Sequence, residues 1–90
     1  MAISAEMGAA LFVAKGCIQC HQHDGIALSK PLVEFGPDLT DYDGSAAFLH
    51  SWLADPAAVK AVAQMPDLEL SAAEIDQLSA FLTAVPFHHL

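Results

Sequence analysis

Apolar residues recur at helical spacing near the C-terminus of the chain. Four of them stand at i, i+3, i+7 and i+10 of one pattern: Ile75, Leu78, Leu82 and Val85. Ser71-Ala-Ala-Glu74 precedes this pattern and fits a capping box, in which two side chains bond to backbone N–H groups at the start of a helix. Pro86 ends the pattern. The spacing therefore predicts a C-terminal helix that begins after Ser71.

A first helix is predicted over residues 5–15. Ser4 is placed to cap its N-terminus, and Gly16 can end it because glycine is favoured just beyond a helix. One side of this helix collects four residues: Gly8, Leu11, Phe12 and Lys15.

A second helix is predicted after Ser45, which can cap it. Its apolar positions recur at spacings of three and four: Phe48, Leu49, Trp52 and Leu53. It ends near Asp55-Pro56, because the residue before a proline disfavours helical geometry. A short helix is expected from Pro56 to about Ala63, since proline is favoured at the first helical position.

Residues 17–44 show no sustained period and contain five helix-breaking residues: Gly25, Pro31, Gly36, Pro37 and Gly44. A loop of this length is uncommon in a small domain unless it packs on a ligand or has a function. The chain shows no strand-like alternation and no internal repeat. We therefore predict one all-α domain over residues 1–90, with three main helices, a short helix and long loops.

Composition leaves room for a large cofactor. Hydrophobic residues make up 54% of the chain, yet there are only one Trp, one Tyr and five Phe, and alanine fills much of that fraction. A chain of 90 residues forms a core of marginal stability by itself. An embedded, flat cofactor would supply the missing volume and stability.

Charge limits the partners of the chain. Eleven acidic residues against three basic ones give a formal net charge of −8, so nucleic acid and anionic lipid are poor partners. No apolar stretch has the length of a signal peptide or of a membrane span, so we expect no direct membrane insertion of this chain and expect any export signal to lie outside it.

Cys17-Ile18-Gln19-Cys20-His21 is a C-x-x-C-H motif, the attachment signature of c-type haem. On a helical turn, residues at i, i+3 and i+4 share one face, so both thiols can form thioethers with the haem vinyl groups while the imidazole reaches the iron. A redox-active C-x-x-C pair would favour a βαβ pattern, and a structural zinc site would need a second pair of ligands at similar spacing. The sequence shows neither feature.

A simple electron carrier needs a second axial ligand, because an open iron binds small molecules. Met65 is the candidate by position: it lies well downstream of the motif, and Pro66 stiffens a non-helical segment that can present the thioether. Position leaves other candidates open, since a lone methionine is often core filler. Four histidines compete with it: His23, His50, His88 and His89.

The chain resembles a class I cytochrome c domain over nearly its full length. The matching segments, in order, are Gly8 with Phe12, the Cys17–His21 motif, Gly36–Leu39, Trp52–Pro56, Met65-Pro66, and Leu78 with Phe81-Leu82. The resemblance favours Met65 as the second ligand. It also implies that the first and last helices cross at right angles, with Gly8 and Phe12 against Leu78 and Phe81.

The resemblance assigns roles to three further residues. It implies that the Pro37 carbonyl accepts the Nδ1–H of His21, which orients the ring and raises its basicity. Trp52 and Tyr42 are similar to residues that hydrogen-bond the haem propionates. Trp52 as a plain core residue of its helix is an equal alternative.

We therefore expect an electron-transfer protein, not an enzyme, that cycles one covalently bound haem c between Fe(II) and Fe(III) with His21 and Met65 as iron ligands. The alternative is a haem enzyme or gas-binding domain with a labile or absent sixth ligand. The expected partners are a redox protein donor and acceptor, including a membrane respiratory complex. Thioether formation in such proteins implies a periplasmic or other extracytoplasmic location.

Overall fold

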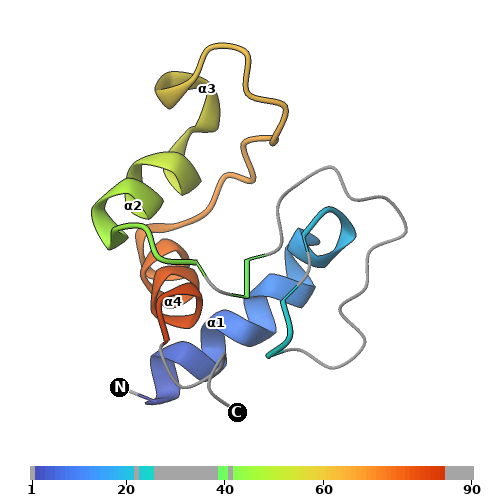
Figure 1. Ribbon diagram of the computed structural model, residues 1–90, viewed down its shortest axis with the longest axis vertical. Helices are drawn as coiled ribbons and strands as arrows, with labels where there is room; N and C mark the ends of the chain where they lie inside the picture. The colour runs from blue at the N-terminus through green and yellow to red at the C-terminus, as the bar shows by residue number, and fades with distance from the viewer. Residues whose placement is uncertain (1, 22, 26–38, 41, 85–90) are drawn as a thin grey trace.

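The computed structural model describes residues 2–21, 23–25, 39–40 and 42–84 (Figure 1). The elements are α1 (Ala2–Ala14), the 3-10 turn η1 (Cys17–Gln19), α2 (Ala46–Ala54), α3 (Pro56–Val59) and α4 (Ala72–Leu82). The described residues contain no strand. The predicted all-α fold, with three main helices and a short one, is confirmed. None of the helices in this described part is both long and apolar enough to cross a membrane.

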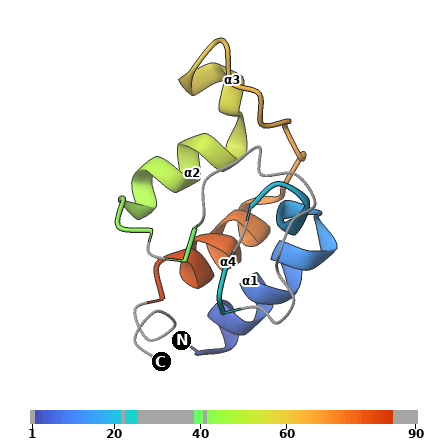
Figure 2. The ribbon, with the colours of Figure 1, turned by 45° about the vertical axis from the view of Figure 1, so that its right-hand side comes forward.

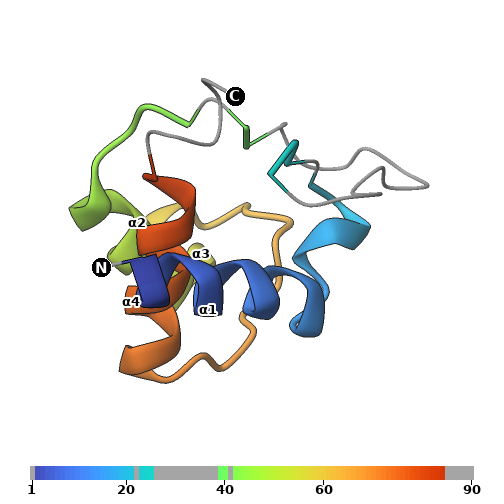
Figure 3. The ribbon, with the colours of Figure 1, turned by 90° about the horizontal axis from the view of Figure 1, so that it is seen from below.

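Helices α1 and α4 cross in close contact at Gly8 (Figure 3). A Cβ atom on Gly8 would overlap the backbone carbonyl of Gln77 and lie 2.7 Å from Cβ of Phe81. The absence of a side chain therefore sets the separation of the two helices. One turn further along α1, the ring of Phe12 lies 5.7 Å from that of Phe81, and both side chains are fully buried. The expected packing of Gly8 and Phe12 against Phe81 is confirmed.

Among the described residues, the core is one cluster contributed by α1, α2 and α4. Its buried apolar members are Phe12, Leu49, Leu53, Ile75, Leu78, Phe81 and Leu82. Leu49 and Leu53 are four residues apart, so they lie on one face of α2, and that face packs on α4. Figure 2 shows α2 beside α4, with α3 continuing away from both helices.

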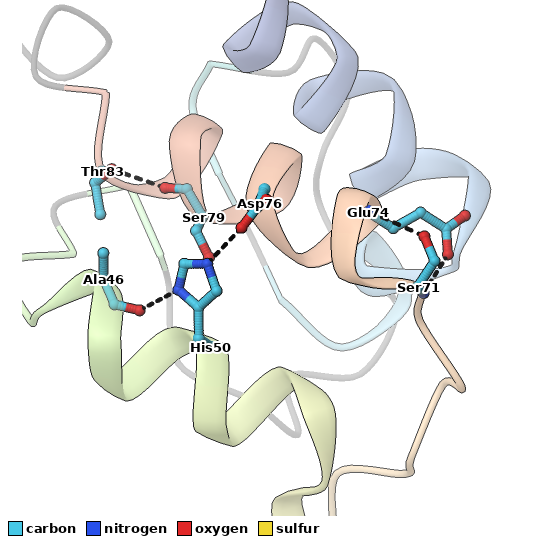
Figure 4. A network of polar contacts seen from close by, with 7 residues as sticks. All are labelled: Ala46, His50, Ser71, Glu74, Asp76, Ser79 and Thr83. Atoms are coloured by element: carbon cyan, nitrogen blue, oxygen red, sulfur yellow. Dashed lines mark hydrogen bonds and ion pairs between the residues drawn. The ribbon is translucent and has the colours of Figure 1, made fainter.

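A polar contact joins α2 to α4 at the edge of this core (Figure 4). His50 on α2 places Nδ1 2.6 Å from the Ala46 carbonyl oxygen and Nε2 2.7 Å from Asp76 Oδ1 on α4. Both neighbours are acceptors, so the doubly protonated imidazolium satisfies both contacts. The pKa of His50 is raised above its usual 6.5, mainly by the hydrogen bond to the Ala46 carbonyl and, to a smaller extent, by the one to Asp76.

Two of the three predicted caps are confirmed. The Ser45 hydroxyl accepts the Phe48 N–H at 3.0 Å at the start of α2. Ser71 and Glu74 form the complete capping box of α4 (Figure 4). The Ser71 hydroxyl accepts the Glu74 N–H at 3.1 Å, and the Glu74 carboxylate accepts the Ser71 N–H at 2.9 Å. The Ser4 cap is wrong, because α1 already begins at Ala2 and Ser4 lies inside it.

Helix α3 is shorter than predicted. It begins at Pro56, as expected, but ends at Val59 rather than near residue 63, and Lys60 is extended. Val59 and Val62 are 43% and 76% exposed, so a longer helix would have no apolar face to bury here. Short helices depend on such packing for their stability, and a turn closed by the bond from the Ala63 N–H to the Lys60 carbonyl follows instead.

Candidate functional site

The C-x-x-C-H motif forms one tight turn directly after α1. Gly16 adopts φ +81°, a left-handed conformation that glycine reaches without strain, and this redirects the chain at the end of the helix. Cys17 O then accepts backbone N–H groups from Cys20 at 3.2 Å and from His21 at 2.9 Å. The predicted helical turn, which brings residues 17, 20 and 21 together, is therefore present.

The two thiols lie at the surface of the core. Cys17 and Cys20 are half-buried, and neither forms a disulfide. Burial raises the pKa of the Cys17 thiol, and a second, smaller increase comes from Cys20. Before haem is attached, the Cys17 side chain therefore packs as a neutral thiol against the apolar core.

An ion pair fixes the turn relative to α4. Lys15, the residue before Gly16, places Nζ 3.3 Å from Glu74 Oε2 in the first turn of α4. The pKa of Glu74 is lowered mainly by the hydrogen bond from the Ser71 N–H and, to a smaller extent, by the contact with Lys15. The sequence did not predict this ion pair, because a contact between residues so distant along the chain leaves no local pattern.

His23, one of the four competing histidines, is a core residue. It is 1% exposed, and its ring centroid lies 4.3 Å from that of Phe81 and 6.1 Å from that of Phe12. Its Nδ1 accepts the Gly25 N–H at 2.9 Å, so this nitrogen is unprotonated. No periodicity in the sequence marks His23 as buried, since it lies outside any helix.

The chain on either side of residues 26–38 comes together. The Asp24 N–H donates to Oγ1 of the buried Thr40 at 2.9 Å. This bond brings residue 40, three positions after Pro37, to the segment that follows the C-x-x-C-H turn. Pro37 itself, with its predicted bond to His21, lies outside the described residues, as do His88 and His89.

Trp52 and Met65, both predicted site residues, contact each other directly. The indole Nε1–H of Trp52 donates to Sδ of Met65 at 3.0 Å, from the end of α2 to the segment between α3 and α4. Both side chains are half-buried and pack against the core cluster. Phe48, one turn earlier in α2, stacks on Trp52 with ring centroids 5.9 Å apart and planes 18° apart. Sequence reasoning named both residues but did not anticipate this contact.

Tyr42 donates its hydroxyl to a backbone group. The acceptor is the Ser45 carbonyl oxygen at 3.1 Å, just before α2. The pKa of Tyr42 is raised mainly by partial burial and, to a smaller extent, by the neighbouring Asp43. The hydroxyl therefore keeps its proton at neutral pH. Its predicted bond to a propionate stays a prediction.

The ligand candidates come from segments on the same side of α4. In all three ribbon views, the turn after α1 and the segment between α3 and α4 lie to one side of that helix (Figures 1–3). The turn carries His21, and the segment carries Met65. Among the described residues, no three His, Cys, Asp or Glu side chains gather as a metal-ion cluster.

The residues present fit a covalently bound haem. The two thiols and the imidazole of Cys17–His21 extend from one short turn, and none of the three is fully buried. The half-buried thioether of Met65 lies on a separate segment. An all-helical domain with this turn directly after its first helix defines a haem-attaching protein. A family model described as cytochrome c matches residues 5–86, and the chain belongs to the cytochrome c family.

Membership of this family establishes the cofactor and the general activity. The chain binds haem c covalently, Cys17 and Cys20 are consistent with the C-x-x-C-H attachment motif, and the general function is haem-based electron transfer. Redox proteins are therefore its partners, and domains of this family are often extracytoplasmic. The chain matches no curated protein and no solved structure.

Proposed function

We propose that this chain is a one-electron carrier in which His21 and Met65 are the two axial ligands of a single haem c. The observation that carries the proposal is the pairing of the Cys17–His21 turn with the half-buried Met65 thioether on a segment on the same side of α4. With both axial positions filled by the protein, a small molecule has no open coordination site, and the reaction is electron transfer without bond formation.

Each residue of the site has a separate task. Cys17 and Cys20 anchor the cofactor, and the backbone bonds to Cys17 O hold the His21 backbone in the same turn. The Pro37 carbonyl is proposed to accept the Nδ1–H of His21, in line with the bond that brings Thr40 beside Asp24. When bound, the haem supplies an iron that exchanges one electron between Fe(II) and Fe(III). A thioether is a soft ligand that favours Fe(II), so Met65 raises the reduction potential.

The charge of the chain supports a positively charged docking face on the partner. The net charge is −8, and two exposed carboxylates, Asp67 and Glu69, directly follow the Met65-Pro66 segment. The Glu69 N–H donates to Asp67 Oδ1 at 2.8 Å, which orders this acidic stretch. We propose a periplasmic or other extracytoplasmic location and a membrane respiratory complex among the partners.

The test is a matched pair of methionine variants of the haem-loaded protein. Met65→Ala removes the proposed ligand, whereas Met7→Ala removes a methionine that is 47% exposed on α1. We expect Met65→Ala to abolish the far-red absorption band typical of methionine bound to Fe(III), to lower the potential and to admit carbon monoxide or cyanide. Met7→Ala should change none of these.

Attachment is tested on the same preparations. Both thiols are consumed by thioether bonds, so acid–organic extraction should leave the haem on the polypeptide and no thiol should react. Cys17→Ala should leave one thioether and a shifted spectrum of the reduced form. Extraction of the haem from the unaltered chain would refute the covalent site. An unchanged spectrum in Met65→Ala would refute only the assignment of the sixth ligand to Met65. His50 would become a candidate only if it gave up its contacts with Ala46 and Asp76.

A further inference from the structure

An exposed apolar strip lies between α2 and Met65. We call residues 57–63 the α3 strip: six of its seven residues are Ala or Val, and the seventh is Lys60. Residues 57–62 are all exposed, and Val62, at 76%, is the most exposed large apolar side chain among the described residues. Contiguous apolar side chains that face water are unfavourable, and they mark surfaces at which another molecule binds.

The fold holds the α3 strip in place at both ends. Pro56, directly before it, is fully buried, and Met65, shortly after it, packs against the core cluster. The Lys60 N–H donates to the Pro56 carbonyl oxygen, and the Ala63 N–H donates to the Lys60 carbonyl oxygen, each at 2.9 Å. Figures 1 and 2 show α3 extending away from α1 and α4, and among the described elements it contacts α2 alone. The strip is therefore a fixed projection that these helices leave uncovered.

Acidic side chains stand at both ends of the α3 strip. No acidic residue lies between Asp55 and Asp67, although the chain contains eleven, and Asp55, Asp67 and Glu69 are all exposed. Lys60 is the single charge within the strip, and no ion pair joins it to another described residue. A molecule that covers the strip therefore meets an apolar centre with one cation, and carboxylates at the two ends.

We propose that the α3 strip is the docking surface for a redox protein that presents an apolar centre surrounded by basic side chains. The inference rests on the electron-carrier function proposed above and names the surface at which the partner binds. The basic groups pair with Asp55 and Asp67, whereas Lys60 repels any cation placed at the centre. Val62 stands three residues before Met65, so at most about 11 Å of chain separates the docked surface from the proposed iron ligand.

The size of the α3 strip favours a transient redox partner over a second copy of this chain. Stable interfaces use about 20 to 30 residues on each side, whereas weak electron-transfer contacts are smaller. The strip has seven residues, and four of them are alanine. Two copies, each with a net charge of −8, also repel each other. A carrier must release its partner after each electron, and a small apolar contact allows this release.

The test places the haem-loaded protein on gold electrodes coated with alkanethiols that end in methyl groups, in amine groups or in a mixture of both. The mixed coating has the chemistry that we assign to the partner. We expect the unaltered chain to adsorb most tightly, and to exchange electrons fastest, on the mixed coating. The double variant Val59→Ser with Val62→Ser should lose about tenfold in its adsorption constant there, because less apolar area is removed from water. Its reaction with a small cationic cobalt(III) oxidant in solution should keep the rate of the unaltered chain.

Two further variants separate the apolar and charged parts of the docking surface. Met7→Ser with Val13→Ser is the matched control, because it removes two apolar side chains of similar exposure, 47% and 48%, from α1. This control should adsorb as the unaltered chain does. Asp55→Asn with Asp67→Asn should abolish the advantage of the mixed coating over the methyl coating. Asparagine at position 67 keeps an oxygen that can accept the Glu69 N–H.

Three results would overturn the proposal. The first is equal adsorption of the Val59→Ser, Val62→Ser variant and the unaltered chain on the mixed coating, and the second is an equal loss in the α1 control. The third is a concentration-dependent dimer in analytical ultracentrifugation that this variant abolishes, which would assign the strip to a second copy of the chain. Adsorption is measured independently of the iron ligands, so absence of Met65 ligation would refute the proposed function and leave the result for the strip intact.

Discussion

Gly8→Ala tests the helix crossing on which the fold depends. The added Cβ would overlap the Gln77 carbonyl oxygen and lie 2.7 Å from Cβ of Phe81, and neither is the movable end of a flexible side chain. Helix α1 must therefore shift away from α4. That shift loosens the packing of Phe12, which is 1% exposed, against Phe81, which is fully buried.

Two opposing effects determine the magnitude. Overpacking a well-packed core costs about 1 to 3 kcal/mol, and a clash with backbone belongs at the upper end. Alanine in place of glycine stabilises a helix interior by about 1 kcal/mol. The net expectation is a loss of about 2 kcal/mol in the free energy of unfolding, or about 8 to 16 °C in Tm for a domain of this size.

The assay is reversible urea unfolding of the haem-loaded protein, followed by far-ultraviolet circular dichroism. The matched control is Ala10→Gly, at an exposed position of the same helix, which isolates helix propensity and should cost about 1 kcal/mol. If Gly8→Ala were as stable as the unaltered chain, or more stable by the propensity increment, α1 and α4 would not approach as closely as described, and the reasoning would be refuted.

Three further outcomes follow from the charges and caps. Because the pKa of His50 is raised in the folded chain, its contacts with Ala46 and Asp76 stabilise the fold fully below pH 6.5 and lose this effect as the pH rises past the raised value. The urea midpoint of the unaltered chain should therefore fall as the pH rises from 6.5 past the raised pKa of His50, and Asp76→Asn should make this fall smaller. The same pH profile for the variant and the unaltered chain would contradict this. Ser71→Ala should cost about 1 kcal/mol in urea unfolding by removing the acceptor of the Glu74 N–H, and no loss would argue against the cap. In stopped-flow experiments, added salt should slow reaction with a cationic oxidant and speed that with an anionic one, because salt screens exposed charges over ~8 Å; a rate that rose with salt for the cationic oxidant would contradict the proposed steering.

Local chemistry made much of the fold predictable. Ser45 and Ser71 cap their helices through bonds to residues three positions away, so the signal lies within one turn of sequence. Gly16 ends α1 for a similarly local reason. Ser4 misled because a serine can cap a helix only where the helix starts, and α1 already begins at Ala2.

Contacts between residues far apart in the chain could not be predicted from the periodicity of the sequence alone. The close approach at Gly8 was inferred from family resemblance, because helical spacing cannot show which helix lies opposite a glycine. The contact of His50 with Asp76 spans 26 residues, and that of Trp52 with Met65 spans 13, so neither leaves a local period. His23 became a core residue through packing on α1 and α4, although a histidine outside a helix reads as a surface group or a ligand.

The two proposed iron ligands are held by different kinds of interaction, and this determines which of them is lost first when the protein unfolds. His21 is held within its own turn by a bond to Cys17 O, and the thioethers would keep that turn beside the haem even in an unfolded chain. Met65 depends on Trp52, and Trp52 depends in turn on the packing of α2 against α4. Any perturbation that separates α2 from α4 therefore acts on Met65 and not on His21. Under rising denaturant, the Met–Fe(III) band should disappear no later than the helical signal of the core, whereas the haem stays attached throughout.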